Sequence, residues 1–429
     1  MTVAPTNTRR YGTITFGTLA PWIVCAVLLL TLPLIFGDRG EITIMSQMAI
    51  MIVFALAYNM LLGQGGMLSF GHAVYVGMGS FLCLHVMNSA SFSSIPVPVL
   101  PLLGGLFGLG IAMIIGSFST RSAGTVFAMI TLGIGELMAA CVLIIVVFFG
   151  GEEGISSDRT EGMPFFGVEF FTHIEAFYVI AFWLLVSSVL MYLFSRTPVG
   201  RMANAVRDNP ERAQFLGYSA RWVRYVSFSA SGFFCGIAGG LSAILFEIAT
   251  ESDLNVGASG IILLIVFLGG VGVFWGPALG AIIFILLQTV LGLQTHLWEL
   301  YVGVIFVCMV MFFPGGIAGL IVAHGVAMSL GKLNLLIRPY LTCVLPGIIG
   351  ALGLCGLVEM IFHLREAAAG EYEMTLFWTD LNTHNFWPWL IFGGIALGGT
   401  LIARNQTPVL KEAWAEANTI EITSVGEPT

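Results

Sequence analysis

The sequence predicts an all-α polytopic membrane protein, and both its composition and its hydropathy pattern carry that prediction. The chain has 429 residues, of which 57% are hydrophobic and 9% are charged. Soluble domains carry about 25% charged residues. Apolar runs recur from Phe16 to Ala403, and each has roughly the 20 residues that a helix needs to cross the hydrocarbon core. We therefore expect one helical membrane domain in place of several soluble ones.

Apolar windows mark twelve candidate helices along the chain. The first is too long for the core of a signal peptide and has no small-residue cleavage site after it, so we expect a retained helix. Two windows, 68–88 and 259–273, border glycine-rich turns, and each either spans the membrane or re-enters from one side. The candidates are 16–36, 42–62, 68–88, 97–119, 124–149, 174–194, 225–249, 259–273, 277–293, 298–313, 340–361 and 386–403.

The basic residues predict the orientation of the chain. If the N-terminus is cytoplasmic, thirteen of the sixteen Lys and Arg residues fall in loops on the cytoplasmic side. The exceptions are Arg39, Arg159 and Arg365. This asymmetry is what the positive-inside rule expects.

A basic segment at 196–224 contains six arginines. Within it, Asn209, Pro210 and Glu211 form a helix start, with Asn as the N-cap, Pro at the first position and an acid in the first turn. Gly217 suits the end of a helix of about two turns. This pattern predicts a short, well-defined helix.

The residues before it predict a second short helix. From Gly200 to Asp208, Met202, Ala205 and Val206 share one helical face, an amphipathic pattern suited to a membrane surface. The alternative for the whole segment is an ordinary cytoplasmic loop held by phospholipid headgroups.

The spacing of Glu211, Ala213 and Gly217 resembles the E-A-A-x-x-x-G loop of ABC importer permeases, in which a short helix docks into the ATPase. Arg212 replaces the middle alanine of that pattern. The stretch from Thr197 to Leu241 is similar to the M-type subunit of the branched-chain amino acid permease family. Three further stretches resemble that family in the same order, and the resemblance runs from about Glu41 to about Leu320; these stretches are Tyr58 to Phe81, Gly124 to Leu137 and Leu268 to Ala281.

The resemblance implies a core of about 10 helices, with about 2 extra helices at the C-terminal end. It places a permease domain at 1–322, with a coupling loop at 195–224, and an extension at 323–429 that has two membrane helices and a polar tail. It also assigns ATPase coupling to Arg201, Asn209, Pro210, Glu211, Ala213 and Gly217.

The same resemblance implies partners and a location. These are a second permease, identical or different, two cytoplasmic ATPases that use ATP and Mg²⁺, an external solute-binding protein and the lipid bilayer of the bacterial inner membrane. Nucleic acid is not expected as a partner, and we expect this chain itself to bind no cofactor. The chain has no GxxxxGK[ST] phosphate loop; its nearest approach, Gly325 to Leu333, has the wrong spacing. We expect a transport subunit, not an enzyme.

Branched-chain or related amino acids are the expected cargo, although relatives assigned to urea, amides and other small solutes leave it open. A secondary transporter is the alternative, and it would need ionisable residues near the membrane midplane. Glu136 and Glu247 are the obvious acids within the apolar runs. A membrane-embedded enzyme would need clustered histidines and acids.

Four polar residues are candidates for the transport path. Ser69, His72 and Tyr75 form a polar stripe, and the alternative for His72 is a hydrogen-bonded structural role. No acid or cysteine stands at helical spacing from His72, so we expect no metal site. Glu136 shares a helical face with small residues and should face the bundle interior or water; its alternative role is packing.

Glycines predict two further features. Gly232, Gly236 and Gly240 repeat every fourth residue, which is typical of close helix packing. The glycine turns at Leu62 to Gly77 and Leu268 to Ala281 resemble each other. They indicate either an internal repeat, as in many transporters, or chance similarity.

The acidic loop from Gly150 to His173 is either a solvated loop or a docking surface.

Overall fold

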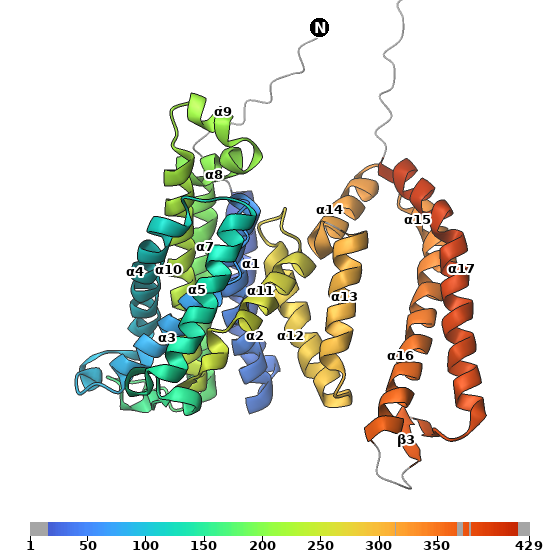
Figure 1. Ribbon diagram of the computed structural model, residues 1–429, viewed down its shortest axis with the longest axis horizontal. Helices are drawn as coiled ribbons and strands as arrows, with labels where there is room; N and C mark the ends of the chain where they lie inside the picture. The colour runs from blue at the N-terminus through green and yellow to red at the C-terminus, as the bar shows by residue number, and fades with distance from the viewer. Residues whose placement is uncertain (1–15, 314, 367–371, 377–378, 419–429) are drawn as a thin grey trace, which may run out of the picture. The chain divides into compact units, whose positions relative to one another are not determined.

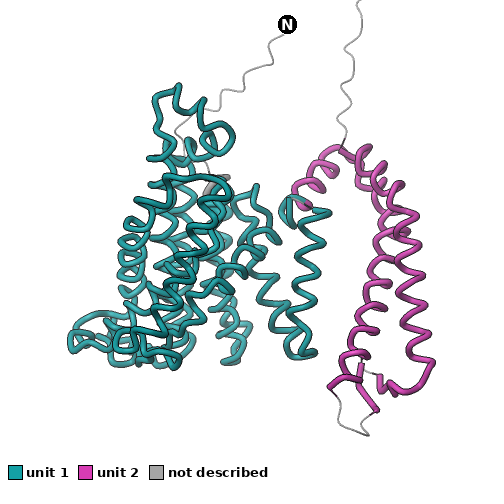
Figure 2. The backbone as a smooth tube through the Cα atoms, in the orientation of Figure 1, with its two compact units in different colours: residues 1–319 teal, residues 320–429 magenta. Residues whose placement is uncertain are grey.

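A computed structural model describes residues 16–313, 315–366, 372–376 and 379–418. The chain divides into two compact units, Met1–Gly319 and Leu320–Thr429 (Figure 2). The division falls within helix α14 (Gly316–Ser329), close to the predicted boundary at 322/323. Residues 1–15, whose cytoplasmic placement the charge pattern predicts, lie outside the described residues.

Unit 1 is a bundle of helices with a two-stranded antiparallel sheet, β1 (Ile155–Ser156) and β2 (Ile248–Ala249) (Figure 1). A π-helical turn, Met60–Gln64, extends α2. The helices are α1 (Phe16–Ile35), α2 (Arg39–Asn59), α3 (Ala73–Met87), α4 (Leu100–Ser119), α5 (Thr125–Ile144), α6 (Val146–Phe149), α7 (His173–Arg196), α8 (Pro198–Asp208), α9 (Pro210–Phe215), α10 (Ala220–Phe246), α11 (Val256–Gly269), α12 (Gly276–Gln294) and α13 (Trp298–Phe312), followed by α14.

All twelve predicted windows contain helix. Within the described ranges, nine helices are long and apolar enough to span a membrane, and counting α13 with α14, which meet at a bend of 47°, gives ten. Two further apolar stretches are shorter, Ala20–Ile35 within α1 and Ala73–Met87, which is α3. Helix α3 begins at Ala73, later than predicted, because the chain turns at Gly66, whose φ is +63°.

Helix α10 is largely buried in unit 1 and packs against α4 and α3, which also pack against each other. The three predicted packing glycines face α4: a Cβ added to Gly232 would lie 2.3 Å from Cβ of Ala112. One added to Gly236 would lie 2.2 Å from the carbonyl oxygen of Gly104. Such distances leave no room for a side chain, so the backbones of α10 and α4 are in direct contact.

Unit 2 is built on a helical hairpin of α16 (Leu345–Glu366) and α17 (Phe386–Asn418), preceded by α15 (Asn334–Pro339) and a π-helical turn, Tyr340–Val344. Glycines bring the two long helices close, since a Cβ on Gly350 would lie 2.8 Å from the amide nitrogen of Thr400. A small hairpin of β3 (Glu373–Leu376) and β4 (Thr379–Asn382) lies between them in sequence.

Unit 2 has more helix than the sequence predicts. The segment after Arg404, predicted as a polar tail, is helical, because α17 continues through it to Asn418. Its last two turns, from Lys411 to Ala417, consist mainly of Ala and Glu, which favour helix even on polar surfaces. Near its end, Ala417 is buried against Ala327 and Leu336, so tertiary contacts stabilise the added turns.

Candidate coupling site and transport path

The basic segment folds into the two short helices that the sequence predicts, α8 and α9, at one end of unit 1 (Figure 1). The side chain of Asn209 accepts a hydrogen bond from the amide of Arg212 at 2.9 Å, which caps α9. Pro210 occupies its first turn. Gly217 has a φ of +85°, and the amide of Tyr218 donates to the carbonyl of Ala213 at 3.2 Å. Both ends of α9 are therefore fixed by the cap residues that the sequence predicts.

A small apolar core joins α8 and α9 to the start of α10. It contains Ala203, Val206, Ala213, Ala220 and Val223. Ala213 is 1% exposed, so its methyl group is a packing element of this core. The prediction that Met202, Ala205 and Val206 form the apolar face of α8 is partly wrong. Val206 is buried, but Ala205 is half-buried and Ala203 is buried in its place. The buried positions of α8 are spaced by three residues: Gly200 lies against the end of α7, and Ala203 and Val206 pack with the start of α10.

The surface of α9 combines charge with large exposed apolar side chains. Glu211 is exposed, Phe215 is 92% exposed and Leu216 is 67% exposed. Sequence reasoning missed Phe215 and Leu216, although two large apolar residues in a short polar loop were a usable signal. An exposed apolar patch rimmed by polar residues is typical of a protein contact surface. Arg201 is also exposed on α8.

Arg207 connects α8 to the transmembrane part of unit 1. Its guanidinium donates a hydrogen bond to the carbonyl of Gly63, in the turn between α2 and α3, and it also pairs with Asp208 at 3.0 Å. A Cβ on Gly66 would lie 2.5 Å from Cγ of Arg207, so the side chain lies directly on the turn. No pattern in the sequence predicts this contact.

The two similar glycine turns meet at the same place. A Cβ on Gly63 would lie 2.7 Å from the carbonyl oxygen of Val271, in the turn between α11 and α12. The turn that Arg207 contacts is thus packed against the second turn, Leu268 to Ala281, which resembles it in sequence. A displacement of α8 would act on both turns through contacts that are already formed.

Below the first turn lies a buried hydrogen-bonded cluster. Ser231 donates to the carbonyl of Ala57 at 2.6 Å, so its hydroxyl must accept from Nε2 of His72, 2.8 Å away. This fixes the neutral His72 tautomer with the proton on Nε2. Nδ1 is buried and has no hydrogen-bond partner among the described residues. His72 thus has the hydrogen-bonded position that the sequence left as its alternative.

Ser69 and Tyr75 belong to the same neighbourhood. The hydroxyl of Tyr58 donates to the backbone carbonyl of Ser69 at 2.8 Å. The rings of His72 and Tyr75 meet edge to face, with centroids 5.1 Å apart. Ser69 and His72 are 0% exposed and Tyr75 is 1% exposed. The polar stripe is therefore buried within this chain, next to the turn between α2 and α3.

Glu136 is not part of that cluster. The side of α5 that carries Thr131 faces the 65–72 segment, since Phe70 donates its amide to the Thr131 hydroxyl at 3.2 Å. Glu136 lies on the exposed side with Met129, which is 64% exposed, and with Gly133, which has no neighbour within 4 Å of an added Cβ. Of the two predicted surroundings of Glu136, the bundle interior and water, the interior of this chain is not where the side chain lies. The small-residue face that includes it is open to a partner.

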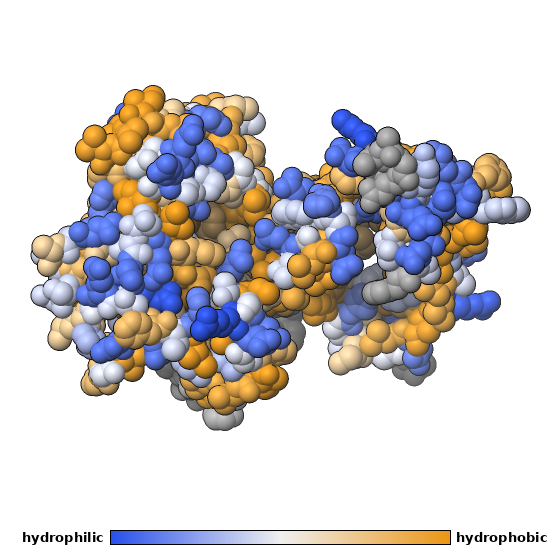
Figure 3. All heavy atoms as spheres, turned by 90° about the horizontal axis from the view of Figure 1, so that it is seen from below, coloured by the Kyte–Doolittle hydropathy of each residue, from blue (hydrophilic) through white to orange (hydrophobic). Residues whose placement is uncertain are grey.

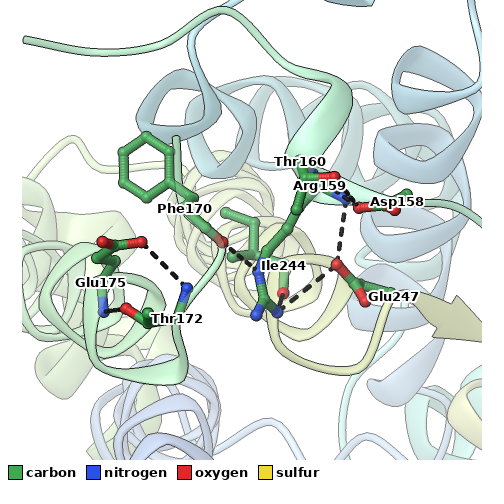
Figure 4. Close-up of polar contacts among 8 residues, drawn as sticks. All are labelled: Asp158, Arg159, Thr160, Phe170, Thr172, Glu175, Ile244 and Glu247. Atoms are coloured by element: carbon green, nitrogen blue, oxygen red, sulfur yellow. Dashed lines mark hydrogen bonds and ion pairs between the residues drawn. The ribbon is translucent and has the colours of Figure 1, made fainter. Parts of the chain in front are cut away.

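The loop between α5 and α7 is held by a buried arginine (Figure 4). Arg159 is 5% exposed, and its guanidinium donates to the carbonyls of Phe170 and Ile244, each at 2.9 Å. It also lies 3.6 Å from the carboxylate of Glu247, just after α10. Glu247 is therefore at a helix end with a basic partner and does not form a midplane site.

Neighbouring contacts reinforce the loop. The strand pair β1–β2 joins it to the residues after α10. The pKa of the Asp158 carboxyl lies below its ordinary value because the hydroxyl and the amide of Thr160 donate hydrogen bonds to it. At this end of unit 1, opposite α9, hydrophilic and hydrophobic residues are interleaved on the surface (Figure 3). The acidic loop is an ordered part of the bundle.

A multi-pass helical bundle with a capped surface helix, joined through Arg207 to the turn between two apolar helices, is an arrangement expected of the membrane component of a transport system. Residues 41–314 match the family described as branched-chain amino acid transport system, permease component, and the chain belongs to this family. The family description makes it a permease component. The matched range agrees with the predicted resemblance, and unit 2 lies outside it.

Individual relatives agree with the family. The chain is 26% identical over 304 residues to the high-affinity branched-chain amino acid transport system permease protein LivM of Salmonella typhimurium and to that of Escherichia coli, covering 65% of this chain and 70% of each relative. It is 22% identical over 293 residues to the ribose import permease protein RbsC of Haemophilus influenzae, covering 63% of this chain and 83% of the relative. No solved structure matches the chain.

Proposed function

We propose that this chain is the M-type permease subunit of an ATP-driven importer for branched-chain or related amino acids. It acts in the bacterial inner membrane with its N-terminus in the cytoplasm. Its partners are a second permease, two ATPases that bind ATP and Mg²⁺, and an external solute-binding protein. The observation that carries this proposal is α9, a doubly capped helix that exposes Glu211 and Phe215 at the end of the bundle.

In this proposal α9 is the contact with an ATPase. Phe215 and Leu216 enter an apolar groove of the partner, and Glu211 meets a basic group at its rim. Because Ala213 is locked in the core that joins α8, α9 and α10, motion of the ATPase would move these elements together. Arg207 then passes the displacement to the turn at Gly63. Arg201, Asn209, Pro210 and Gly217 keep the predicted role of shaping this unit.

The exposed face of α5 is proposed to meet the second permease. A charged side chain facing hydrocarbon costs about 2.5–3.5 kcal/mol on insertion scales, so Glu136 needs a protein neighbour or water. Gly133 and Ala140 on the same exposed face would allow close approach of another helix. Glu136 would then line the path between the two permeases. The cluster of Ser69, His72 and Tyr75 would support the turn between α2 and α3.

A secondary transporter, the alternative, would need an acid near the membrane midplane, and Glu136 and Glu247 were the two candidates. Glu247 no longer fits this role, because it pairs with Arg159 at a helix end. The two proposals differ in their energy source. Proteoliposomes containing this chain, a candidate partner permease and both ATPases, with the binding protein outside, should accumulate labelled leucine only with ATP and Mg²⁺. Uptake by this chain alone, driven by a sodium or proton gradient, would contradict the proposal.

The cargo can be tested in the same proteoliposomes. Unlabelled isoleucine and valine should compete with labelled leucine, whereas urea and ribose should not. Competition by urea alone, or by ribose alone, would reject branched-chain amino acids while leaving the ATP-driven mechanism in place.

A further inference from the structure

A second site lies between the end of α4 and the start of α10. It is a cavity of about 450 Å³. Polar and aromatic side chains from both helices line it, and two of them are arginines. The lining residues are Ser117, Thr120, Arg121, Ser219, Arg221, Trp222 and Tyr225.

Two positive charges converge in this cavity. Nε of Arg121 lies 3.1 Å from the carbonyl oxygen of Ser117, and Nη2 of Arg221 lies 3.4 Å from the same oxygen. Among the described residues, no carboxylate lies within 4 Å of either guanidinium. Two like charges held at one carbonyl oxygen repel each other, and an anion between them would remove that repulsion.

The hydrogen-bonding groups also favour an anion. The hydroxyls of Ser117 and Thr120 donate to carbonyls within α4, at 2.7 and 2.6 Å. The Ser219 oxygen accepts from the amide of Trp222 at 3.4 Å. In the described part of the chain, the remaining N–H groups of the two arginines have no hydrogen-bond acceptor. The cavity thus offers donors in excess of acceptors.

The surroundings favour a lipid as the source of that anion. Trp222 is 61% exposed, and its ring lies 5.6 Å from that of Tyr225, between centroids. Aromatic rings of this kind gather at the membrane–water interface. On α4, next to Ser117, Ile114 is 69% exposed and Phe118 is 46% exposed. The cavity therefore adjoins an apolar surface that acyl chains would cover.

We propose that this cavity binds the phosphate-bearing headgroup of an anionic phospholipid from the cytoplasmic leaflet. The phosphate accepts hydrogen bonds from Arg121 and Arg221, and the glycerol backbone lies beside Trp222. A basic pocket between membrane helices on the cytoplasmic side has the chemistry that recognises such headgroups. The bound lipid ties α4 to the first turn of α10, directly after the core that holds α9.

The test is native mass spectrometry of the full chain from micelles containing equal amounts of phosphatidylglycerol and phosphatidylcholine. The wild type should retain phosphatidylglycerol preferentially. Each substitution, Arg121→Gln and Arg221→Gln, should lower the retained fraction about fivefold, which corresponds to the typical contribution of one basic residue near a membrane surface. Arg404→Gln removes one exposed charge outside the cavity and should leave retention unchanged.

Three results would overturn the proposal. These are unchanged retention in both cavity variants, an equal loss in Arg404→Gln, and displacement of the lipid by millimolar inorganic phosphate, which would assign the site to a free anion. Helix content and elution volume show whether each variant is folded. If Arg221→Gln fails to fold, Arg121→Gln provides the same test, because Arg121 lies in the turn after α4.

Discussion

The contacts of Arg159, the buried arginine in the loop between α5 and α7, allow us to predict how a substitution changes the opening of that loop. Arg159→Met keeps an apolar stem but removes the guanidinium that donates to Phe170 and Ile244 and pairs with Glu247. We expect the loop to separate more often from the end of α10 while the helical bundle stays folded. The perturbation is local because, among the described residues, the guanidinium's polar partners belong to the loop and to the residues that end α10.

The size of the effect follows from the two hydrogen bonds. A hydrogen bond from a charged group contributes about 1.5–3 kcal/mol. We use the lower value for each, since both carbonyls regain water when the loop opens. The loss of about 3 kcal/mol corresponds to a roughly 100-fold rise in the open population. The ion pair adds little, because the Glu247 side chain is 33% exposed and such pairs contribute about 0–1 kcal/mol.

Hydrogen exchange measures this opening directly. The amide of Ser157 donates to the carbonyl of Glu247 at 2.9 Å and is released when the loop separates. Its exchange should accelerate by up to about 100-fold in Arg159→Met. Arg39→Met, which removes an exposed arginine, should leave it unchanged. Equal exchange at Ser157 in the wild type and in Arg159→Met would refute the reasoning.

Three further predictions concern the bundle and its coupling contacts. Gly236→Val places a side chain 2.2 Å from the carbonyl oxygen of Gly104 and should cost about 1–3 kcal/mol, lowering the thermal unfolding midpoint, whereas Gly110→Val, with open space around it, should be milder. Arg207→Ala removes the contact with Gly63 and should lower ATP-driven uptake about tenfold, in line with one charged hydrogen bond, without lowering the unfolding midpoint; normal uptake would argue against that link. In the assembled transporter, Glu136→Cys should react with a charged thiol reagent while Met113→Cys, on the apolar surface of α4, should not; equal labelling would exclude a hydrated path at α5.

The helices and the ends of α9 could be predicted because their causes are local. An apolar run of sufficient length favours a membrane helix wherever it occurs, and all twelve windows contain helix. Asn209, Pro210 and Gly217 act on α9 through their own backbone neighbours, so sequence spacing alone is informative.

The missed features depend on residues far apart in the sequence. Arg207 contacts Gly63, 144 positions away. The end of α17 is stabilised partly by Ala417 packing against Leu336. The exposure of Glu136 depends on which side of α5 faces the 65–72 segment, and helical periodicity fixes the face but not its neighbour. The cavity between α4 and α10 likewise requires knowledge of how two separate helices pack.

The coupling role of α9 is tested most directly by the ratio of imported solute to hydrolysed ATP in reconstituted transporters. Glu211→Lys reverses an exposed charge, and Gly217→Val strains a backbone with φ of +85°. Both variants should insert and unfold normally yet import less solute per ATP hydrolysed. Glu412→Lys, the same charge reversal on exposed α17, serves as the matched control and should keep the wild-type ratio. A wild-type ratio in both Glu211→Lys and Gly217→Val would contradict the account.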